Sequence, residues 1–417
     1  MSNGVALAPL RRRAFATVWA GGFVSNVGTW MQAAALGYYV AHLTRSAGWS
    51  AVVAAGEFAP TALLGPIGGA IADRWSRRAI FLTTTLAQAF FAAVLTWAMI
   101  VGHPSAGVIA IYAVANGCMF ALGFPAFQSL LPELVPASEL PAAIGISSAS
   151  WNLGRVIGPV LGTLVYQQWG IPWVLGLNAV SFFAVVAALL TLRLPGRPPT
   201  HAPLFAAIVD GIRFVRAEPG LRLTVQALCL NTLFVAPFIG LIPAMVEKEL
   251  GGGKRAVGLL ITAQGLGAVA MGFVFGALVE RHGVRRVMTT ALVAGPVALA
   301  AYASAPNLGV AAVALVATGS LYFAALSSFS STAQLRAPGE YRGRVLSTNQ
   351  VVLGTVYAIS VNVEGHLGDT FGLRTVTIVG AAISLLVLLV LRVTRPGITA
   401  VLDTPSALSA QVSVPTD

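Results

Sequence analysis

Apolar residues form long, nearly uninterrupted runs along most of this chain. The run at residues 382–391, AISLLVLLVL, is apolar on every side, whereas strands of a membrane barrel alternate apolar and polar residues. A helix needs about 20 mainly apolar residues to cross the hydrocarbon core of a bilayer. Twelve stretches reach that length, and they lie at residues 15–43, 48–72, 79–101, 106–131, 142–168, 172–194, 223–246, 256–279, 287–304, 309–333, 345–366 and 373–392. The pattern predicts an all-α integral membrane protein with twelve transmembrane helices, and the even number places both chain ends on one side.

A polar break divides this pattern near the middle of the chain. Residues 194–203 read LPGRPPTHAP, a proline-rich linker. Behind it, Leu204, Ile208, Ile212 and Val215 share one face of an amphipathic helix, which we expect to lie along the cytoplasmic membrane surface. The expected organisation is a cytoplasmic N-terminus at 1–14, a six-helix bundle at 15–194, a linker containing the amphipathic helix at 195–222, a second six-helix bundle at 223–393 and a disordered cytoplasmic tail at 394–417.

Composition and charge agree with a membrane protein and give its expected orientation. Hydrophobic residues make up 57% of the 417 residues and charged residues only 9%, which excludes a soluble globular domain. Most of the 25 Lys and Arg fall in loops on the side that holds both chain ends, so that side is expected to be the cytoplasm of a bacterial-type inner membrane. The net charge of +11 is therefore a signal of topology, and no nucleic-acid partner is needed to explain it.

One charged motif occurs twice, half a chain length apart. Residues 69–78 read GAIADRWSRR and residues 276–286 read GALVERHGVRR, each following the second predicted span of its half. Both contain a Gly, three small or apolar residues, an acid, an Arg and further Arg residues. The repeat indicates a duplicated six-helix unit.

This repeat resembles the signature loop of the major facilitator superfamily, and the resemblance covers residues 15–393. It implies two pseudo-symmetric six-helix halves and a gating motif at Gly69, Asp73, Arg74, Arg77, Arg78, Gly276, Glu280 and Arg281. Ser76 replaces a usual Gly, which Gly283 keeps in the second half. The resemblance implies that Asp73 latches one conformation through a contact between the halves. The alternative is that these residues only enforce topology.

The fifth predicted span contains a second motif, NLGRVIGPVLGT at residues 152–163. Its glycines recur every four residues and so share one helix face that a partner helix can approach closely, while Pro159 permits a bend. The motif resembles the one that marks antiporters of the superfamily, and we expect Gly154, Gly158, Pro159 and Gly162 to hold the two halves in register. Packing of small residues without any transport role is the alternative.

A third stretch, PAFQSLLPELVPASEL at residues 125–140, resembles the branch that contains siderophore and macrolide exporters. The arginine that many proton-driven members carry early in the fourth span is absent, and Asn116 and Gly117 stand near its place.

Polar residues inside the spans are few, and a charge near a helix centre costs about 2.5–3.5 kcal/mol on insertion scales. Glu57 is the first candidate for a proton carrier, and a solvated position near the periplasmic rim is the alternative. Arg155 is expected to take part in proton coupling: it could bind an anionic cargo group, pair with an acid or depress the pKa of that acid, and the alternative is a structural bond to backbone carbonyls freed around Pro159. Glu364 is the second candidate for proton coupling, with a structural role or a part in an extracellular gate as the alternative. The resemblance to the superfamily implies that spans one, four, seven and ten line a central cavity and that span eight lies at its flank. The polar and aromatic residues of these spans are the candidate cavity residues: Asn26, Trp30, Gln32, Asn116, Asn231, Gln264 and Tyr322.

These features predict a secondary transporter that exports a drug-like, macrolide or siderophore molecule in exchange for protons. Uptake or uniport of a small metabolite and a lipid-handling membrane protein are the alternatives. Cys118 and Cys229 form no CxxC pair, the five His show no metal-ligand spacing, and no nucleotide-binding loop occurs, so neither an enzyme nor a cofactor nor a metal is expected. The expected partners are a small-molecule substrate, protons and membrane lipid, and a monomer is expected to function.

Overall fold

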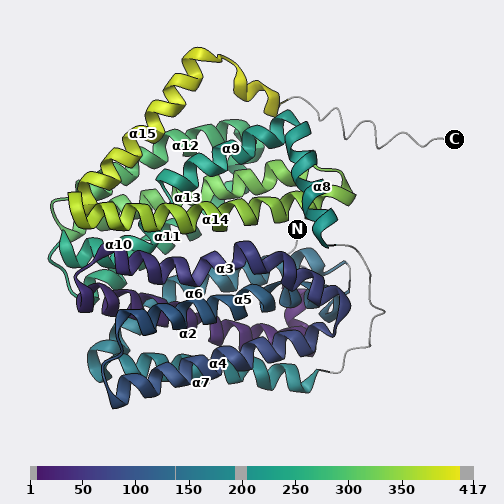
Figure 1. Cartoon of the computed structure of the whole chain (residues 1–417). Coiled ribbons are helices and arrows are strands. Elements are labelled where there is room, and N and C mark those ends of the chain that lie inside the picture. Colours follow the sequence, from purple (N-terminus) through teal and green to yellow (C-terminus); the bar gives the residue numbers. More distant parts are fainter. Residues whose placement is uncertain (1–6, 137, 193–203, 404–417) are drawn as a thin grey trace.

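The computed structural model describes residues 7–136, 138–192 and 204–403, and in these residues it contains helices and no strand (Figure 1). The first half consists of α2 (Arg13–Thr44), α3 (Ala47–Arg74), α4 (Arg77–Val101), α5 (Ala106–Leu134), α6 (Leu140–Trp169) and α7 (Ile171–Thr191). The second half consists of α9 (Pro219–Phe234), α10 (Phe238–Lys248), α11 (Lys254–His282), α12 (Val284–Ala303), α13 (Leu308–Arg336), α14 (Gly339–Phe371) and α15 (Leu373–Thr394). Two short elements, η1 (Ala8–Arg11) and η2 (Ile398–Leu402), flank the halves, and α8 (Leu204–Ala217) lies between them.

The two halves repeat the same packing. In the first half α3 packs on α5, α4 on α5 and α7, and α2 on α6; in the second half α11 packs on α13, α12 on α13 and α15, and α9 on α14. The last two helices of each half join at a glycine with positive φ, Gly170 at 87° and Gly372 at 83°, a backbone conformation that other residues rarely adopt. The repeat predicted from the charged motif is therefore present in the structure.

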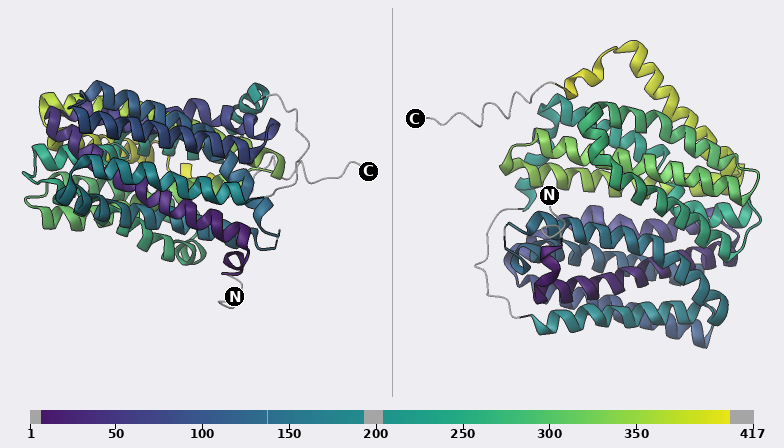
Figure 2. Two further views of the ribbon diagram at one scale, coloured as in Figure 1. Left: turned by 90° about the horizontal axis from the view of Figure 1, so that it is seen from below. Right: turned by 180° about the vertical axis from the view of Figure 1, so that it is seen from behind.

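The halves lie side by side with their helices roughly parallel (Figures 1 and 2). The end of the bundle that carries η1, α8 and η2 is called the linker end, and the end where α10 meets α11 is called the far end. Between the halves, α3 packs on α14 and α11 packs on α6, while α10 contacts α2 and α3. Buried apolar side chains form one large cluster that extends from α10 across to α3 and separate clusters within each half.

Nine segments of the described chain are long and apolar enough to cross a membrane, with α9 and α10 counted as one of them. The helices α2, α6 and α14 fall outside this group although they occupy predicted spans. They are rich in Gly, Ser and Asn, and they pack against other helices of the bundle. The positions of the predicted spans agree with the helices, while the number of twelve stays a prediction.

The seventh predicted span is divided into α9 and α10. Pro237 has no backbone N–H to continue the helix, and the amide of Ala236 instead donates to the carbonyl of Asn231 at 3.1 Å. The chain therefore makes a turn at Val235–Pro237 in the middle of the bundle.

The predicted amphipathic helix is α8, and it packs on α9 and α14 at the linker end. Val215 is buried there, and Asp210 pairs with Arg344 of α14 at 3.5 Å. The tail prediction differs from the structure in its first part, because η2 is helical and Leu402 packs into a core cluster of the second half. Residues 195–203 and 404–417 of the predicted linker and tail lie outside the described residues.

Candidate substrate cavity

A cavity of about 240 Å³ lies between the two halves. All six helices of the first half contribute to its wall, and α10, α11 and α14 complete it. At the linker end it reaches Trp19 of α2 and Phe81 of α4, each within two turns of its helix start. Among the residues that the structure describes, no three His, Cys, Asp or Glu side chains are grouped so that they could hold a metal ion.

The structure brings most of the predicted cavity and coupling residues to this cavity. The residues that line it are Asn26, Trp30, Gln32, Glu57, Asn116, Arg155 and Gln264. Asn231 and Tyr322, which were predicted to line the cavity, do not line it, and Glu364, the second coupling candidate, also lies outside its wall. Tyr322 packs edge-on against Phe238 with ring centroids 5.9 Å apart, and Glu364 accepts a hydrogen bond from Thr377 at 2.6 Å within the second half.

Asn231 is buried on α9, close to the turn where that helix ends. The resemblance to the superfamily placed Asn231 in the seventh span, which was expected to line the cavity, but the helix of that span is interrupted just after this residue. The break at Val235–Pro237 therefore accounts for its different environment.

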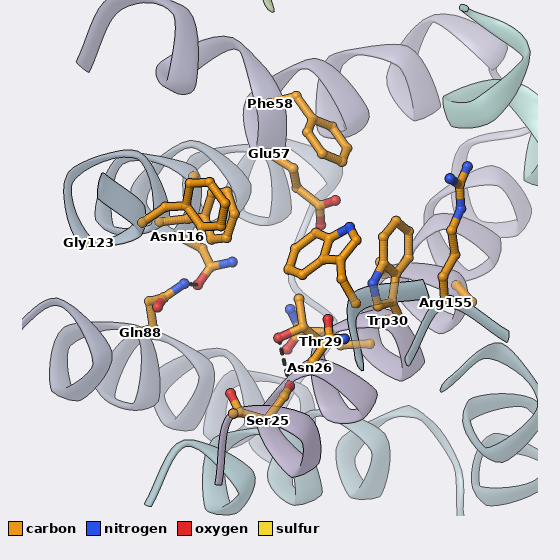
Figure 3. A pocket seen from close by; sticks show the side chains of 18 of the residues that line it. Ser25, Asn26, Thr29, Trp30, Glu57, Phe58, Gln88, Asn116, Gly123 and Arg155 are labelled. Atoms are coloured by element: carbon orange, nitrogen blue, oxygen red, sulfur yellow. Dashed lines mark hydrogen bonds between the residues drawn. The ribbon is translucent and has the colours of Figure 1, made fainter. Parts of the chain in front are cut away.

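Glu57 is the acidic side chain of the cavity wall, and it points into the cavity from α3 (Figure 3). In the described part of the chain its carboxylate has neither a hydrogen bond nor an ion pair. Beside Glu57, helices α3 and α5 approach each other closely at Gly117 of α5. A Cβ at this position would lie 2.5 Å from the carbonyl oxygen of Gly56 on α3, so only glycine allows the approach. Next to Glu57, Phe58 contacts Tyr357 of α14 edge-on at 5.8 Å, which places the carboxylate beside a contact between the halves.

Arg155 of α6 is the cationic side chain of the cavity wall. Its guanidinium carbon lies 5.4 Å from the centroid of the Trp30 ring, a distance typical of a cation–π contact. Its Nε is buried and has no hydrogen-bond partner. Arg155 and Glu57 share the cavity without forming an ion pair with each other, and no bond from Arg155 to a backbone carbonyl is present in the described residues.

Aromatic rings form one side of the cavity. Phe120 and Phe124 lie 5.2 Å apart, Phe120 and Trp151 5.9 Å, and Trp151 and Trp30 5.8 Å between ring centroids. The sequence analysis did not select the phenylalanines, although Phe120, Phe124 and Phe127 share a helical face of α5. The wall presents large apolar surfaces with few charges.

The amides of the cavity are partly bonded to neighbouring helices. Asn26 donates to the carbonyl of Ser150 at 2.8 Å, and Gln88 donates to Asn116 at 3.3 Å. Gln32 donates to the hydroxyl of Tyr112 at 2.7 Å and accepts from Asn178 at 2.9 Å. The Nε2 atom of Gln264, from the second half, is buried without a partner. These bonds connect the helices of the first half around the cavity.

At the far end, polar contacts between the halves close the cavity. Asp369 of α14 accepts hydrogen bonds from Ser46 Oγ at 2.6 Å and from the amides of Ala47 and Gly48 at 2.7 and 2.9 Å, and so caps α3 across the interface. Lys248 pairs with the same carboxylate at 2.6 Å.

The carboxylate of Glu247 is a second acidic group in the contacts between the halves at the far end. Glu247 forms an ion pair with Arg45 at 2.8 Å, and its carboxylate also lies 3.1 Å from Nδ1 of His42, so both contacts join the two halves. We refer to Arg45, Ser46, Glu247, Lys248 and Asp369 as the far-end lock. Partial burial would raise the pKa of Asp369, but the hydrogen bonds from Lys248, Ser46 and the two amides outweigh it and lower that pKa to about 2.

The predicted gating motif makes its contacts within the first half. Arg77 pairs with Glu133 at 2.6 Å, and Arg78 donates to the carbonyls of Leu189 and Leu190 at the end of α7. Arg74, Glu280 and Arg281 are exposed, and Gly69 and Gly276 have no atom near the position of a Cβ. The side chain of Asp73 lies outside the described residues. None of the described residues of the motif forms a hydrogen bond or an ion pair between the halves.

The three glycines of the predicted antiporter motif pack within the first half, and a role of the motif in holding the halves in register stays a prediction. A Cβ on Gly158 would lie 2.6 Å from Cβ of Trp30, and one on Gly162 would lie 2.6 Å from the carbonyl of Met31. Gly154 meets Asn26 in the same way. All three therefore face α2.

The opposite face of α6 makes the contact between the halves. Gly258 of α11 lies against Thr163 and the carbonyl of Pro159, and Gly265 of α11 lies against Val156 and Arg155. The sequence analysis missed these two glycines. Spacing reveals that glycines share a face, but it does not reveal which helix that face meets.

Comparison with known proteins agrees with this architecture. A family model described as transmembrane secretion effector matches residues 4–412. The multidrug efflux pump Tap of Mycolicibacterium fortuitum is 27% identical over 361 residues, which cover 83% of this chain and 87% of the pump. The enterobactin exporter EntS of Salmonella choleraesuis (strain SC-B67) is 28% identical over 313 residues, which cover 72% of this chain and 73% of the exporter.

Solved structures show the same fold at low sequence identity. The nucleoside transporter NupG superposes with a TM-score of 0.70 at 12% identity, covering 94% of this chain and 99% of NupG. The D-xylose–proton symporter superposes with a TM-score of 0.71 at 15% identity, covering 91% and 96%. The chain belongs to the transmembrane secretion effector family of the major facilitator superfamily, whose members are multi-pass membrane transporters and not enzymes.

Proposed function

We propose that this protein exports small organic molecules across the inner membrane by alternating access, in exchange for protons. The supporting observation is a cavity between two repeated halves, closed at its far end by the far-end lock. The excess of Lys and Arg in loops at the linker end supports a cytoplasmic position of that end and of both chain ends. This conformation is then the one that admits cargo from the cytoplasm, and the export activities named for Tap and EntS support that direction.

The proposed cargo is an aromatic or amphipathic molecule of the drug, macrolide or siderophore kind. The aromatic side of the cavity offers stacking surfaces, and Arg155 offers a contact for one anionic or strongly polar group. Pockets for drug-sized ligands commonly have about 300–1,000 Å³. A cavity of about 240 Å³ therefore has to widen at the linker end for a large cargo.

Glu57 is proposed as the proton carrier, because it is the carboxylate of the cavity wall and it has no partner in the described residues. In this cycle, Glu57 releases a proton to the cytoplasm before cargo enters. After the halves rock, cargo leaves at the far end and Glu57 takes up a proton there. One cargo molecule moves outward as one or more protons move inward.

The test uses the purified full chain in proteoliposomes, with a fluorescent dye, a macrolide and a catecholate siderophore as cargo. Transport is measured with and without an imposed pH difference, and exchange of labelled for unlabelled cargo is measured without one. Glu57→Gln should abolish transport driven by the pH difference and retain exchange, because the neutral amide keeps the cavity but cannot carry a proton. Glu364→Gln is the matched comparison, because it neutralises a buried carboxylate away from the cavity.

Each result separates the proposals. If Glu57→Gln keeps the full dependence of transport on the pH difference, Glu57 is not the proton carrier. If only Glu364→Gln loses that dependence, Glu364 is the proton carrier. Transport of the parent protein without any dependence on pH supports uniport. Failure to move any member of the panel contradicts the proposed cargo class.

A further inference from the structure

A second pocket lies at the linker end, outside the transport pathway. It is bounded by the first two turns of α9 and by the chain that returns after α15. Its wall combines the polar side chains of Arg222, Gln226 and Arg395 with the apolar side chains of Leu223, Ile398 and Val401. None of these residues lines the central cavity.

Among the described residues, no carboxylate pairs with the two arginines of this pocket. Glu218, one turn before Arg222, forms a buried ion pair with Arg336. Asp403, which follows η2, pairs with Arg285 at 2.8 Å. In the described part of the chain, Arg222 and Arg395 have no ion pair. Two positive charges are therefore available to an external anion at one place.

The end of α15 leaves an apolar surface next to this pocket. Its buried residues are Leu373, Thr377, Ala381 and Ser384, and none of the following residues to the end of the helix is buried. Leu386 and Leu389 are each 58% exposed. Figures 1 and 2 show α15 leaning away from the bundle towards its C-terminal end, with the chain returning to α9 through η2.

We propose that this pocket binds the phosphate of an anionic phospholipid. Arg222 and Arg395 contact the phosphate oxygens, Gln226 donates to the headgroup, and the acyl chains lie along the exposed leucines of α15. Basic pockets at helix ends, at the depth of the headgroups, bind anionic lipids in this manner. A free phosphate offers the same anion, but the adjoining apolar face of α15 matches only a phosphate that carries acyl chains.

The test is native mass spectrometry of the full chain in detergent, titrated with dioleoyl phosphatidylglycerol or dioleoyl phosphatidylcholine. The variant Arg222→Gln/Arg395→Gln should lower the affinity for phosphatidylglycerol about thirtyfold, since each of the two arginines near a headgroup contributes about 1 kcal/mol. The matched control is Arg286→Gln/Arg342→Gln, which removes two exposed arginines of the same half and the same end outside the pocket. It should leave the affinity within about twofold.

Two further arms distinguish the lipid from a free anion. Leu389→Gln should weaken phosphatidylglycerol binding without a change of charge, because it alters only the acyl-chain surface. Inorganic phosphate at millimolar concentration should fail to displace the lipid from the parent protein.

Equal losses in both double variants, or no loss in either, would overturn the proposal. Displacement by phosphate together with unchanged binding in Leu389→Gln would assign the site to a free anion instead. The melting temperature of each variant shows whether a loss of binding reflects a loss of fold.

Discussion

At the scale of single residues, Asp369 connects the two halves in the far-end lock. It accepts hydrogen bonds from Ser46 and from the amides of Ala47 and Gly48, at the positive end of the α3 dipole, and it pairs with Lys248. Asp369→Asn removes the charge but keeps the size. Because the carboxylate is 29% exposed and water competes for it, we expect a cost of about 1–2 kcal/mol to the closed far end, or roughly fivefold to thirtyfold.

Labelling from outside the cell measures this opening. A cysteine replaces Ser50, which is buried on the cavity wall near the far end, in a chain whose Cys118 and Cys229 are changed to Ser. Its reaction with a membrane-impermeant maleimide should accelerate in Asp369→Asn. Asp403→Asn is the control, because that carboxylate pairs with Arg285 inside the second half at the linker end. An unchanged labelling rate in Asp369→Asn would show that the lock does not hold the far end closed.

The pKa of the Asp369 carboxyl group determines how its contribution to the far-end lock changes with pH. Its pKa is lowered from 3.8 to about 2, so the charged form favours the closed state. That contribution is complete above pH 3.8 and is lost as the pH falls towards and through 2. The labelling rate of the Ser50→Cys protein should therefore gain no pH dependence from Asp369 between pH 5 and 8. If Asp369→Asn removed a pH dependence seen in that range, the assigned pKa would be wrong.

At the scale of helices, the packing of α6 on α2 depends on glycine. A Cβ on Gly158 would lie 2.6 Å from Cβ of Trp30 and 2.8 Å from the amide nitrogen of Met31, and backbone cannot move aside as a flexible side chain can. Gly158→Ala should lower stability by about 1–3 kcal/mol, the usual cost of overpacking. Gly145→Ala, on the same helix with no atom within 4 Å, should leave it unchanged or slightly higher. Thermal unfolding of both purified variants compares them, and equal melting temperatures would contradict this account.

The helices could be predicted from the sequence because apolar length is a local property of the chain. The cavity candidates Asn26, Glu57 and Arg155 could be predicted because a polar residue is rare inside a span. Asn231 could not be placed, because the turn beside it depends on how α9 and α10 pack. Asp369 could not be connected to Ser46, since only the tertiary fold brings the end of α14 to the start of α3.

At the scale of the whole molecule, the two interfaces between the halves are equivalent by the repeat. The second helix of each half packs on the fifth helix of the other, α3 on α14 and α11 on α6. Glycines allow close approach along both. Gly354 lies against Ala62, and Gly365 lies against Ala51 and the carbonyl of Ala47. Smooth, glycine-rich contacts of this kind let two rigid halves rock about their centre, which alternating access requires.

A side chain added at one end of this interface should therefore shift the balance between the two conformations. A Cβ on Gly365 would lie 2.6 Å from Cβ of Ala51 and 2.8 Å from the carbonyl oxygen of Ala47, so Gly365→Leu should separate α14 from α3 at the far end. The wedge disfavours only the conformation in which these helices touch there, and we expect the far end to open. The Ser50→Cys label should then react from outside at least about tenfold faster, which corresponds to about 1.4 kcal/mol.

Gly107→Leu, at the far end of α5 with only Ser105 nearby, should have no such effect. If Gly365→Leu reduced expression and labelling together, the contact would be needed for folding. If labelling stayed slow in a stable protein, the halves would not rock about this interface.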